Sequence, residues 1–131
     1  MSATLTRGKL EEIAEQSIAT KLPKIAEYLQ GTLGQKLTAY IAGLTDPKAV
    51  GSWIQGDNEP RDTAALRLRY AYQIVRMLIE AYDADTAKAW LLGSNTRLND
   101  EAPAYLLRNA KAVDGLRQLI PTARAFAGSS E

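Results

Sequence analysis

The sequence predicts an all-α protein, and three observations support this prediction. Apolar residues recur at spacings of three and four in almost every segment, as they do on one face of an amphipathic helix. No segment shows the sustained alternation of apolar and polar residues that is typical of a strand. Glycine and proline stand where short helices would begin or end. With 131 residues, the chain can form one domain or two very small ones.

The first helical pattern covers residues 9–30 and contains a proline. Its apolar residues, from Leu10 to Leu29, form one stripe. Pro23 lies within this stripe and cannot donate the backbone hydrogen bond that an interior helical position requires. We therefore expect a kink at this position, or two shorter helices.

Two shorter helical patterns follow and are joined by a turn. The first covers residues 33–44, and Gly43 suits a helix end in the left-handed conformation. The second follows Asp46, a favourable N-cap, and has Pro47 as its first helical residue. Gly56 is expected to end it. The residues expected to face inward are Val50, Trp53 and Ile54.

The longest helix is predicted for residues 62–82. A helix that is apolar over so much of its surface is expected in the middle of a bundle. Its apolar residues at intervals of four are Leu66, Tyr70, Ile74, Leu78 and Tyr82, and the stripe is widened by Val75, Met77 and Ile79.

Shorter helices are predicted for the rest of the chain. Either Asp83 or Asp85 caps the first of them, and Pro103 starts the second after a turn-rich stretch. Residues 113–128 are predicted to form the last helix, with a break at Pro121.

The composition excludes several kinds of functional site. The chain has no cysteine and no histidine, so it has no disulfide, no thiolate nucleophile and none of the usual soft or imidazole metal ligands. Histidine is also the side chain best suited to acid–base chemistry near neutral pH. We therefore expect a protein that is not an enzyme and uses no cofactor or metal. Because no long apolar run or secretory signal is present, we expect it in the cytoplasm, away from membranes.

Residues 49–61 raise the question of DNA binding. The two helices joined by residues 43–47 resemble a helix-turn-helix unit of the Xre type. The resemblance implies that Lys48, Ser52 and Gln55 face the bases of a major groove. The phosphate contacts would come from Lys36, Arg61, Arg67 and Arg69. The net charge of only +1 favours moderate, salt-sensitive binding by a dimer.

A purely structural interpretation stays open for the same residues. Any helical hairpin in a bundle has similar spacing, so residues 49–61 could form one more amphipathic helix. The arginines could equally serve only to solvate the outside of the long helix.

The C-terminal part, residues 87–126, has a second set of landmarks. A tryptophan-containing helix is followed by a Gly-x-Asn-x-x-Leu turn, a helix that begins with proline, and a last helix. In this order they resemble the toxin-binding domain of the Xre/MbcA/ParS antitoxin family, and the resemblance extends over residues 32–127. The matching residues are Trp90, Gly93, Asn95, Leu98, Pro103, Leu106, Leu107 and Phe126. Each also has a structural explanation, as a core residue, a turn residue or a helix start.

The resemblance implies a division of the chain into three regions. Residues 1–31 would form an N-terminal helical extension, residues 32–82 the helix-turn-helix region and residues 83–131 the C-terminal toxin-binding domain. Members of the family are antitoxins paired with RES-domain toxins, which resemble ADP-ribosyltransferases and deplete cellular NAD. The chain would thus belong to a type II toxin-antitoxin system.

The implied mechanism is steric. The C-terminal segment would cover the NAD pocket of the cognate RES-domain toxin, and the helix-turn-helix would bind operator DNA for transcription regulation of its own operon. The complex would be a hetero-oligomer that contains a homodimer of this chain. Residues expected to touch the toxin are Arg117, Arg124, Phe126, Ser129, Ser130 and Glu131.

Two further expectations concern this mechanism. Co-expression is expected to rescue cells from the neighbouring toxin, and deletion of residues 120–131 is expected to abolish this rescue and to leave the fold intact. The alternative function is a stand-alone Xre-type transcriptional regulator, whose C-terminal half would serve dimerisation or the sensing of a small molecule. A neighbouring gene for a RES-type protein would favour the antitoxin.

Overall fold

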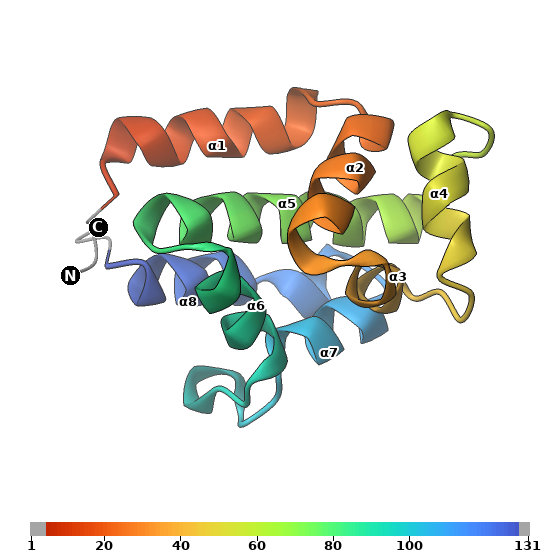
Figure 1. Ribbon diagram of the computed structural model, residues 1–131. Helices are drawn as coiled ribbons and strands as arrows, with labels where there is room; N and C mark the ends of the chain where they lie inside the picture. The colour runs from red at the N-terminus through yellow and green to blue at the C-terminus, as the bar shows by residue number, and fades with distance from the viewer. Residues whose placement is uncertain (1–4, 129–131) are drawn as a thin grey trace.

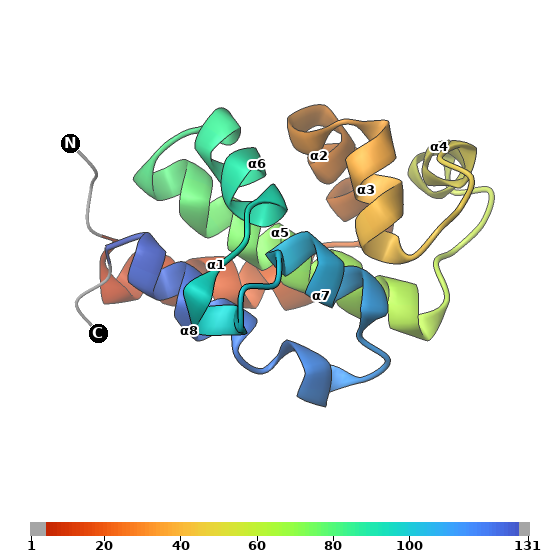
Figure 2. The same cartoon turned by 90° about the horizontal axis from the view of Figure 1, so that it is seen from below.

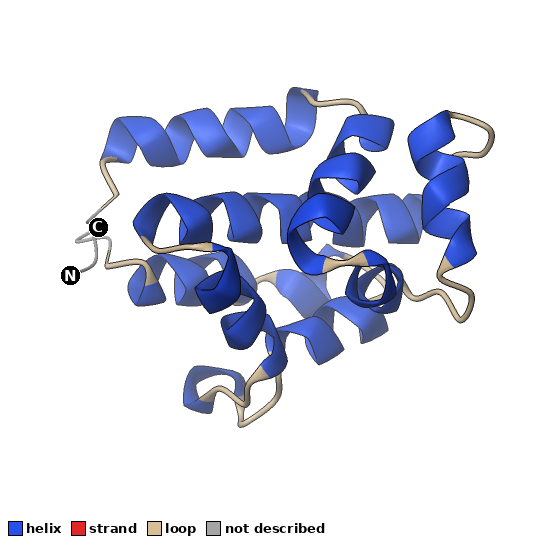
Figure 3. Ribbon diagram, viewed as in Figure 1, coloured by secondary structure: helices blue, strands red, loops and turns tan. Residues whose placement is uncertain are grey.

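The computed structural model describes residues 5–128, and helices form most of it, as the sequence predicts (Figure 1). The α-helices in this range are α1 (Arg7–Ala19), α2 (Leu22–Leu33), α3 (Gln35–Ala42), α4 (Lys48–Gln55), α5 (Asp62–Ala81), α6 (Ala84–Leu92), α7 (Pro103–Asn109) and α8 (Leu119–Phe126). Short 3-10 helices, η1 (Thr96–Leu98) and η2 (Val113–Leu116), flank α7. Figure 3 shows no strand within the described residues, where an isolated antiparallel bridge joins Asn95 and Glu101.

The proline in the first helical pattern separates two helices. Helix α1 ends at Ala19 and α2 begins at Leu22, so that Pro23 is the second residue of α2. A proline is tolerated there because the N–H groups of the first turn have no partner within the helix. The expectation of two shorter helices is confirmed.

Glycines in the left-handed conformation end α3 and α4, as predicted. Gly43 has φ 91° and Gly56 has φ 84°, backbone angles that residues with a Cβ rarely adopt. The start of α4 lies one residue later than expected, at Lys48, because Pro47 takes the cap position. The Asp46 carboxylate still accepts a hydrogen bond from the Lys48 N–H, at 3.0 Å.

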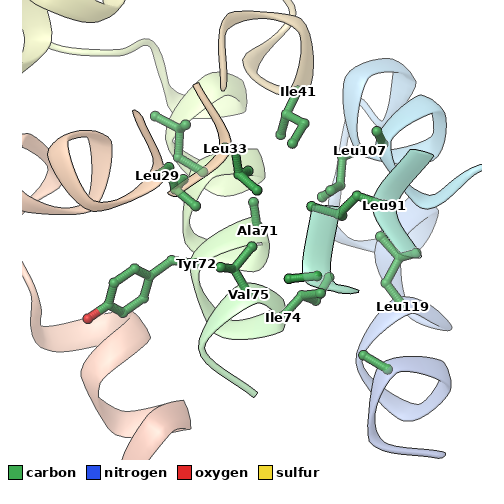
Figure 4. Packing of buried hydrophobic residues seen from close by; sticks show 14 of the residues in the cluster. Leu29, Leu33, Ile41, Ala71, Tyr72, Ile74, Val75, Leu91, Leu107 and Leu119 are labelled. Carbon is green, nitrogen blue, oxygen red and sulfur yellow. The ribbon is translucent and has the colours of Figure 1, made fainter. Parts of the chain in front are cut away.

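Helix α5 lies in the middle of the bundle, which confirms its prediction. It packs against α1, α2, α3, α6, α7 and α8. Its side chains Ala71, Ile74 and Val75 are fully buried. Figure 4 shows them between residues of α2 and α3 on one side and residues of α6, α7 and α8 on the other.

One hydrophobic core runs through all three regions expected from the sequence. The cluster of buried side chains begins at Leu5, includes Val50 and Trp53 of α4, and ends at Ala127. The N-terminal extension, the predicted helix-turn-helix and the C-terminal half therefore pack on a common core.

The turns of the C-terminal half follow the sequence expectations closely. Asp83 is the N-cap of α6, and Pro103 is the first residue of α7. The Asn95 side chain accepts a hydrogen bond from the backbone N–H of Arg97, at 3.0 Å, and so shapes the turn. None of the described helices has the length and apolar character needed to cross a bilayer.

The last helix was predicted wrongly in two respects. The chain breaks at Arg117 and Gln118, between η2 and α8, and Pro121 lies in the first turn of α8. A proline fits there for the same reason as in α2. The break comes earlier because Gly115 disfavours a continuous helix through the preceding segment.

Helix α8 belongs to the core, which contradicts the expectation about deletion of residues 120–131. The side chains of Leu119 and Ala123 are buried, as is Ala127 just after the helix, and α8 packs along α5. Deletion of residues 120–131 would therefore expose the side of α5 that this helix covers.

The Asp83 cap gives a pH-dependent contribution to stability. Its carboxylate accepts the N–H of Thr86 at 2.7 Å. Hydrogen bonds from the Thr86 hydroxyl, and then from its N–H, lower the pKa of Asp83. Because the pKa is lower in the folded state, the stabilisation is complete above the pKa of the unfolded chain and is lost as the pH falls through the folded value.

We expect Asp83→Asn to flatten the acid side of the stability profile. Between about pH 5 and pH 2, the free energy of unfolding should fall more for the natural protein than for the variant. Urea unfolding at a series of pH values measures this. Asp83→Ser, which keeps a capping oxygen without a titrating group, should behave like Asp83→Asn on the acid side. Identical profiles for all three proteins would contradict the assignment.

Candidate functional site

Helix α4 lies at one end of the bundle and has an outward-facing surface. In Figure 1 it lies at the right edge, and its main neighbours are α2 and α3. Val50 and Trp53 are buried, as predicted, and Ile54 is partly buried against the core. The same view looks along the axis of α3, whereas α4 lies in the plane of the picture, so the two helices cross steeply.

The polar side chains predicted to touch DNA fall into two groups, those that form hydrogen bonds within the described structure and those that do not. Five of them take no part in the side-chain hydrogen bonds and ion pairs of residues 5–128. They are Lys36, Lys48, Ser52, Gln55 and Arg61. Ser52 is partly exposed and the other four are exposed. These side chains are thus available to an external ligand.

Acidic residues limit the positive charge around α4. Asp46 and Asp57 lie just before and just after the helix, and both are exposed, as are Glu59 and Asp62 in the connection to α5. This mixture of charges is consistent with a modest electrostatic attraction for phosphate.

The Arg67 side chain forms hydrogen bonds within the molecule. Its Nε and Nη2 donate to the carbonyl of Ala110, at 3.0 and 2.7 Å, and its Nη1 donates to the carbonyl of Ala42, at 2.9 Å. Burial, and then repulsion from Arg108, lower the pKa of Arg67. The guanidinium lies where a Cβ on Gly43 would be, so glycine is needed there for space as well as for its backbone conformation.

The Arg69 side chain also forms hydrogen bonds within the molecule, at the C-terminal end of α1. Its Nη1 donates to the carbonyls of Ser17, Ile18 and Thr20, at 2.9, 3.1 and 2.8 Å. Carbonyls at a helix C-terminus have no partner within the helix, so a guanidinium satisfies them well. The structure therefore does not bring Arg67 and Arg69 to the outward face of α4 to bind phosphate.

A second candidate surface surrounds Phe126, at the end of α8. Phe126 is 41% exposed and lies beside a groove of about 420 Å³. The groove is lined by Asp85, Thr86, Ala89, Trp90, Gly93, Ser94, Asn95 and Phe126. Its floor is largely apolar, with the Trp90 ring 6.2 Å from that of Phe126 between centroids. An apolar floor with a polar rim suits the binding of another protein.

The Phe126 side chain is held in place from α5. Its ring centroid lies 5.1 Å from that of Tyr82, and the Tyr82 hydroxyl donates to the Phe126 carbonyl at 2.5 Å. A half-exposed aromatic ring that is already fixed loses little conformational entropy on binding. The sequence indicated Phe126 as a contact residue and Trp90, Gly93 and Asn95 as landmarks of the domain. It did not indicate that Tyr82 and these landmarks meet Phe126, because they come together only in the folded chain.

Of the other residues expected to touch a toxin, the structure describes Arg117 and Arg124. Arg117 lies before the opposite end of α8 and forms an ion pair with Asp114 at 2.9 Å. Arg124 is partly exposed in the last turn of α8. Ser129, Ser130 and Glu131 lie outside the described residues.

The two candidate surfaces lie at opposite ends of α5. Its N-terminal end adjoins α4, on the right of Figure 1, and its C-terminal end adjoins the end of α8, on the left. A helix of 20 residues is about 30 Å long. The surfaces are therefore far enough apart to be occupied by two ligands at the same time.

Within the described part of the chain, no three His, Cys, Asp or Glu side chains lie close enough together to hold a metal ion. Comparisons of the chain with protein-family models, with curated proteins and with solved structures found no match.

Proposed function

We propose that this protein is an antitoxin that represses its own operon, with α3 and α4 on the DNA and the Phe126 groove on a partner protein. One observation supports the proposal: two surfaces with side chains available to ligands lie at opposite ends of the same helix bundle, which has one hydrophobic core. Such an arrangement lets one molecule hold DNA and a partner together. The proposed activity requires no catalytic group.

The DNA-binding part of the proposal rests on the geometry of α3 and α4. The helices cross steeply, and the turn between them begins with a left-handed glycine, as in helix-turn-helix units. Helix α4 has 8 residues and is about 12 Å long, and an α-helix with its side chains, about 10–12 Å in diameter, fits a major groove about 12 Å wide. Gln55 and Ser52 read base edges, and Lys48 adds charge. Lys36 and Arg61 contact phosphates, and a homodimer doubles these contacts on an operator with two half-sites.

The partner that we propose is the RES-domain toxin encoded by the neighbouring gene. Phe126 enters a pocket of the toxin, and the residues that follow it in the chain cover the NAD site. The support is the resemblance of residues 87–126 to a toxin-binding domain, together with the fixed, half-exposed ring of Phe126. Aromatic side chains of this kind often dominate the energy of an interface.

We expect Phe126→Ala to weaken binding of the neighbouring gene product by about 2 kcal/mol or more, roughly 30-fold. Titration calorimetry on the purified proteins gives the affinity, and growth of cells that express both genes shows whether protection is lost. Val113→Ala is a matched control, since Val113 is 42% exposed and lies outside the groove.

Three outcomes separate the possibilities. Loss of affinity in Phe126→Ala alone supports the groove as the binding surface. Equal affinity for both variants and the natural protein would contradict it. If the natural protein binds DNA but no product of a neighbouring gene, the chain is a stand-alone regulator instead.

A further inference from the structure

Helices α3 and α7 lie side by side, and every charged residue within the segments that contain them is basic, with Asp46, Glu101 and Asp114 just outside these segments. The two helices pack directly against each other (Figure 2). Residues 34–45 and 102–113 contain no aspartate or glutamate; their charged residues are Lys36, Arg108 and Lys111. Elsewhere the chain mixes the two signs, with 16 basic and 15 acidic residues in all. We call these three residues the α3–α7 basic strip.

Arg108 in the middle of this strip is fixed by α3. Its Nη1 donates to the carbonyls of Tyr40 and Leu44, at 2.8 and 3.2 Å. Its guanidinium carbon lies 4.7 Å from the centroid of the Tyr40 ring. These contacts hold the side chain in one orientation.

The other nitrogens of Arg108 remain available. Its Nε and Nη2 form no hydrogen bond with any residue in the range 5–128. Together they present a two-pronged edge, which is the geometry with which arginine binds a phosphate through two parallel hydrogen bonds. Since the guanidinium is already oriented, little further order is needed on binding.

No ion pair among the described residues neutralises the α3–α7 basic strip. The ion pairs among the described residues involve Lys9, Lys24 and Arg117, and none of them involves the basic strip. The C-terminal end of α3 contributes only about half a negative charge, whereas Arg67 and Arg108 both bind its carbonyls. The mutual repulsion of these two arginines adds to burial in lowering the pKa of Arg67.

The strip lies next to the proposed reading helix. Leu44, whose carbonyl Arg108 binds, is in the turn that leads from α3 to Lys48 at the start of α4. Lys36 lies one turn before Tyr40 on the exposed side of α3. We infer that the α3–α7 basic strip binds the phosphate backbone of DNA beside the groove that α4 enters, so that the C-terminal half of the chain takes part in DNA binding. This inference rests on the proposed DNA-binding function and adds to it contacts from α7.

The test uses the two lysines, because their exposed side chains make no internal contact that folding depends on. We expect Lys36→Gln/Lys111→Gln to weaken binding of duplex DNA roughly tenfold or more at low salt. The slope of log K against log salt should decrease in magnitude by about 1.8 for each bound protomer, because each phosphate contact contributes about 0.9. Both operator and random duplexes should be affected alike, since phosphate contacts carry no sequence preference.

Arg108→Gln should reduce the same slope by about 0.9 for each bound protomer. Because this variant also loses the bonds to Tyr40 and Leu44, its thermal unfolding is measured alongside. A purely structural role would lower the melting temperature without changing the salt slope. Lys24→Gln/Lys88→Gln, at exposed positions of α2 and α6, is the matched control and should leave the slope unchanged.

The outcomes distinguish this inference from the function on which it rests. If the natural protein binds no duplex DNA, both are overturned. If it binds DNA and the binding depends on α4, but the lysine variant keeps the full salt slope, only the basic strip is overturned. If millimolar inorganic phosphate saturates Arg108 without competing with DNA, the strip is a site for free phosphate and the inference is again overturned.

Discussion

Replacement of Lys48 and Gln55 together by alanine is expected to weaken binding to the operator by about 2–4 kcal/mol, or roughly 30- to 1,000-fold. Both side chains point outward from α4 and neither has a partner within the described structure. The fold should therefore not change, and thermal unfolding should be the same as for the natural protein. Gel-shift or fluorescence titration with DNA from upstream of the gene measures the affinity, at one stated salt concentration.

The double variant has a matched control. Lys88→Ala/Gln118→Ala removes the same two types of side chain from exposed positions on the C-terminal half. It should bind the operator as tightly as the natural protein does. If both double variants bind equally well, α4 does not read the operator, and the assignment of Lys48 and Gln55 has to be abandoned.

The second large effect concerns stability and involves Arg67. We expect Arg67→Met to lower the free energy of unfolding by about 2–3 kcal/mol, because it leaves the carbonyls of Ala42 and Ala110 without the guanidinium that satisfies them. The methionine keeps part of the apolar stem, so the loss reflects the hydrogen bonds. Urea unfolding monitored by circular dichroism gives the value.

Arg61→Met is the counterpart of this variant. Arg61 is exposed and has no internal partner in the described structure, so its loss should change stability by less than about 0.5 kcal/mol. It should instead reduce the slope of log K against log salt for DNA binding by about 1 for each bound protomer, which corresponds to one phosphate contact. The reverse pattern, with a stable Arg67→Met that has a reduced salt slope, would show that Arg67 binds phosphate after all.

The parts of the fold that follow from local chemistry could be predicted from the sequence. Pro23 and Pro103 start or divide helices, Gly43 and Gly56 end them, and Asp83 caps one, because each residue acts on backbone groups within a few positions. The central position of α5 follows from its apolar surface in the same way.

Other features depend on contacts between distant segments and could not be predicted. Arg67 binds a carbonyl 43 residues away, and Arg69 binds carbonyls 49 to 52 residues away. On the sequence alone, such arginines cannot be told from solvated ones or from phosphate ligands. The break before α8 was misplaced because a proline is visible in the sequence, whereas its tolerance in a first turn depends on where the helix begins.

The candidate sites show the same division. The outward side chains of α4 follow from helical periodicity once Val50 and Trp53 are known to face inward. The groove beside Phe126 forms between α6 and α8. Tyr82, at the end of α5, holds Phe126 in place. No single segment contains the information that these three elements meet.

The central claim is that DNA and the partner protein occupy opposite ends of one bundle. The most direct test is to follow the amide resonances of the isotope-labelled protein during titration with duplex DNA from upstream of its gene. The account predicts that the shifts are confined to α4, Arg61 just before α5, the start of α3 and the end of α7, and that resonances around Trp90 and Phe126 do not move. Shifts that centre on the Phe126 groove, or no shift at all at DNA concentrations well above the micromolar range, would contradict it.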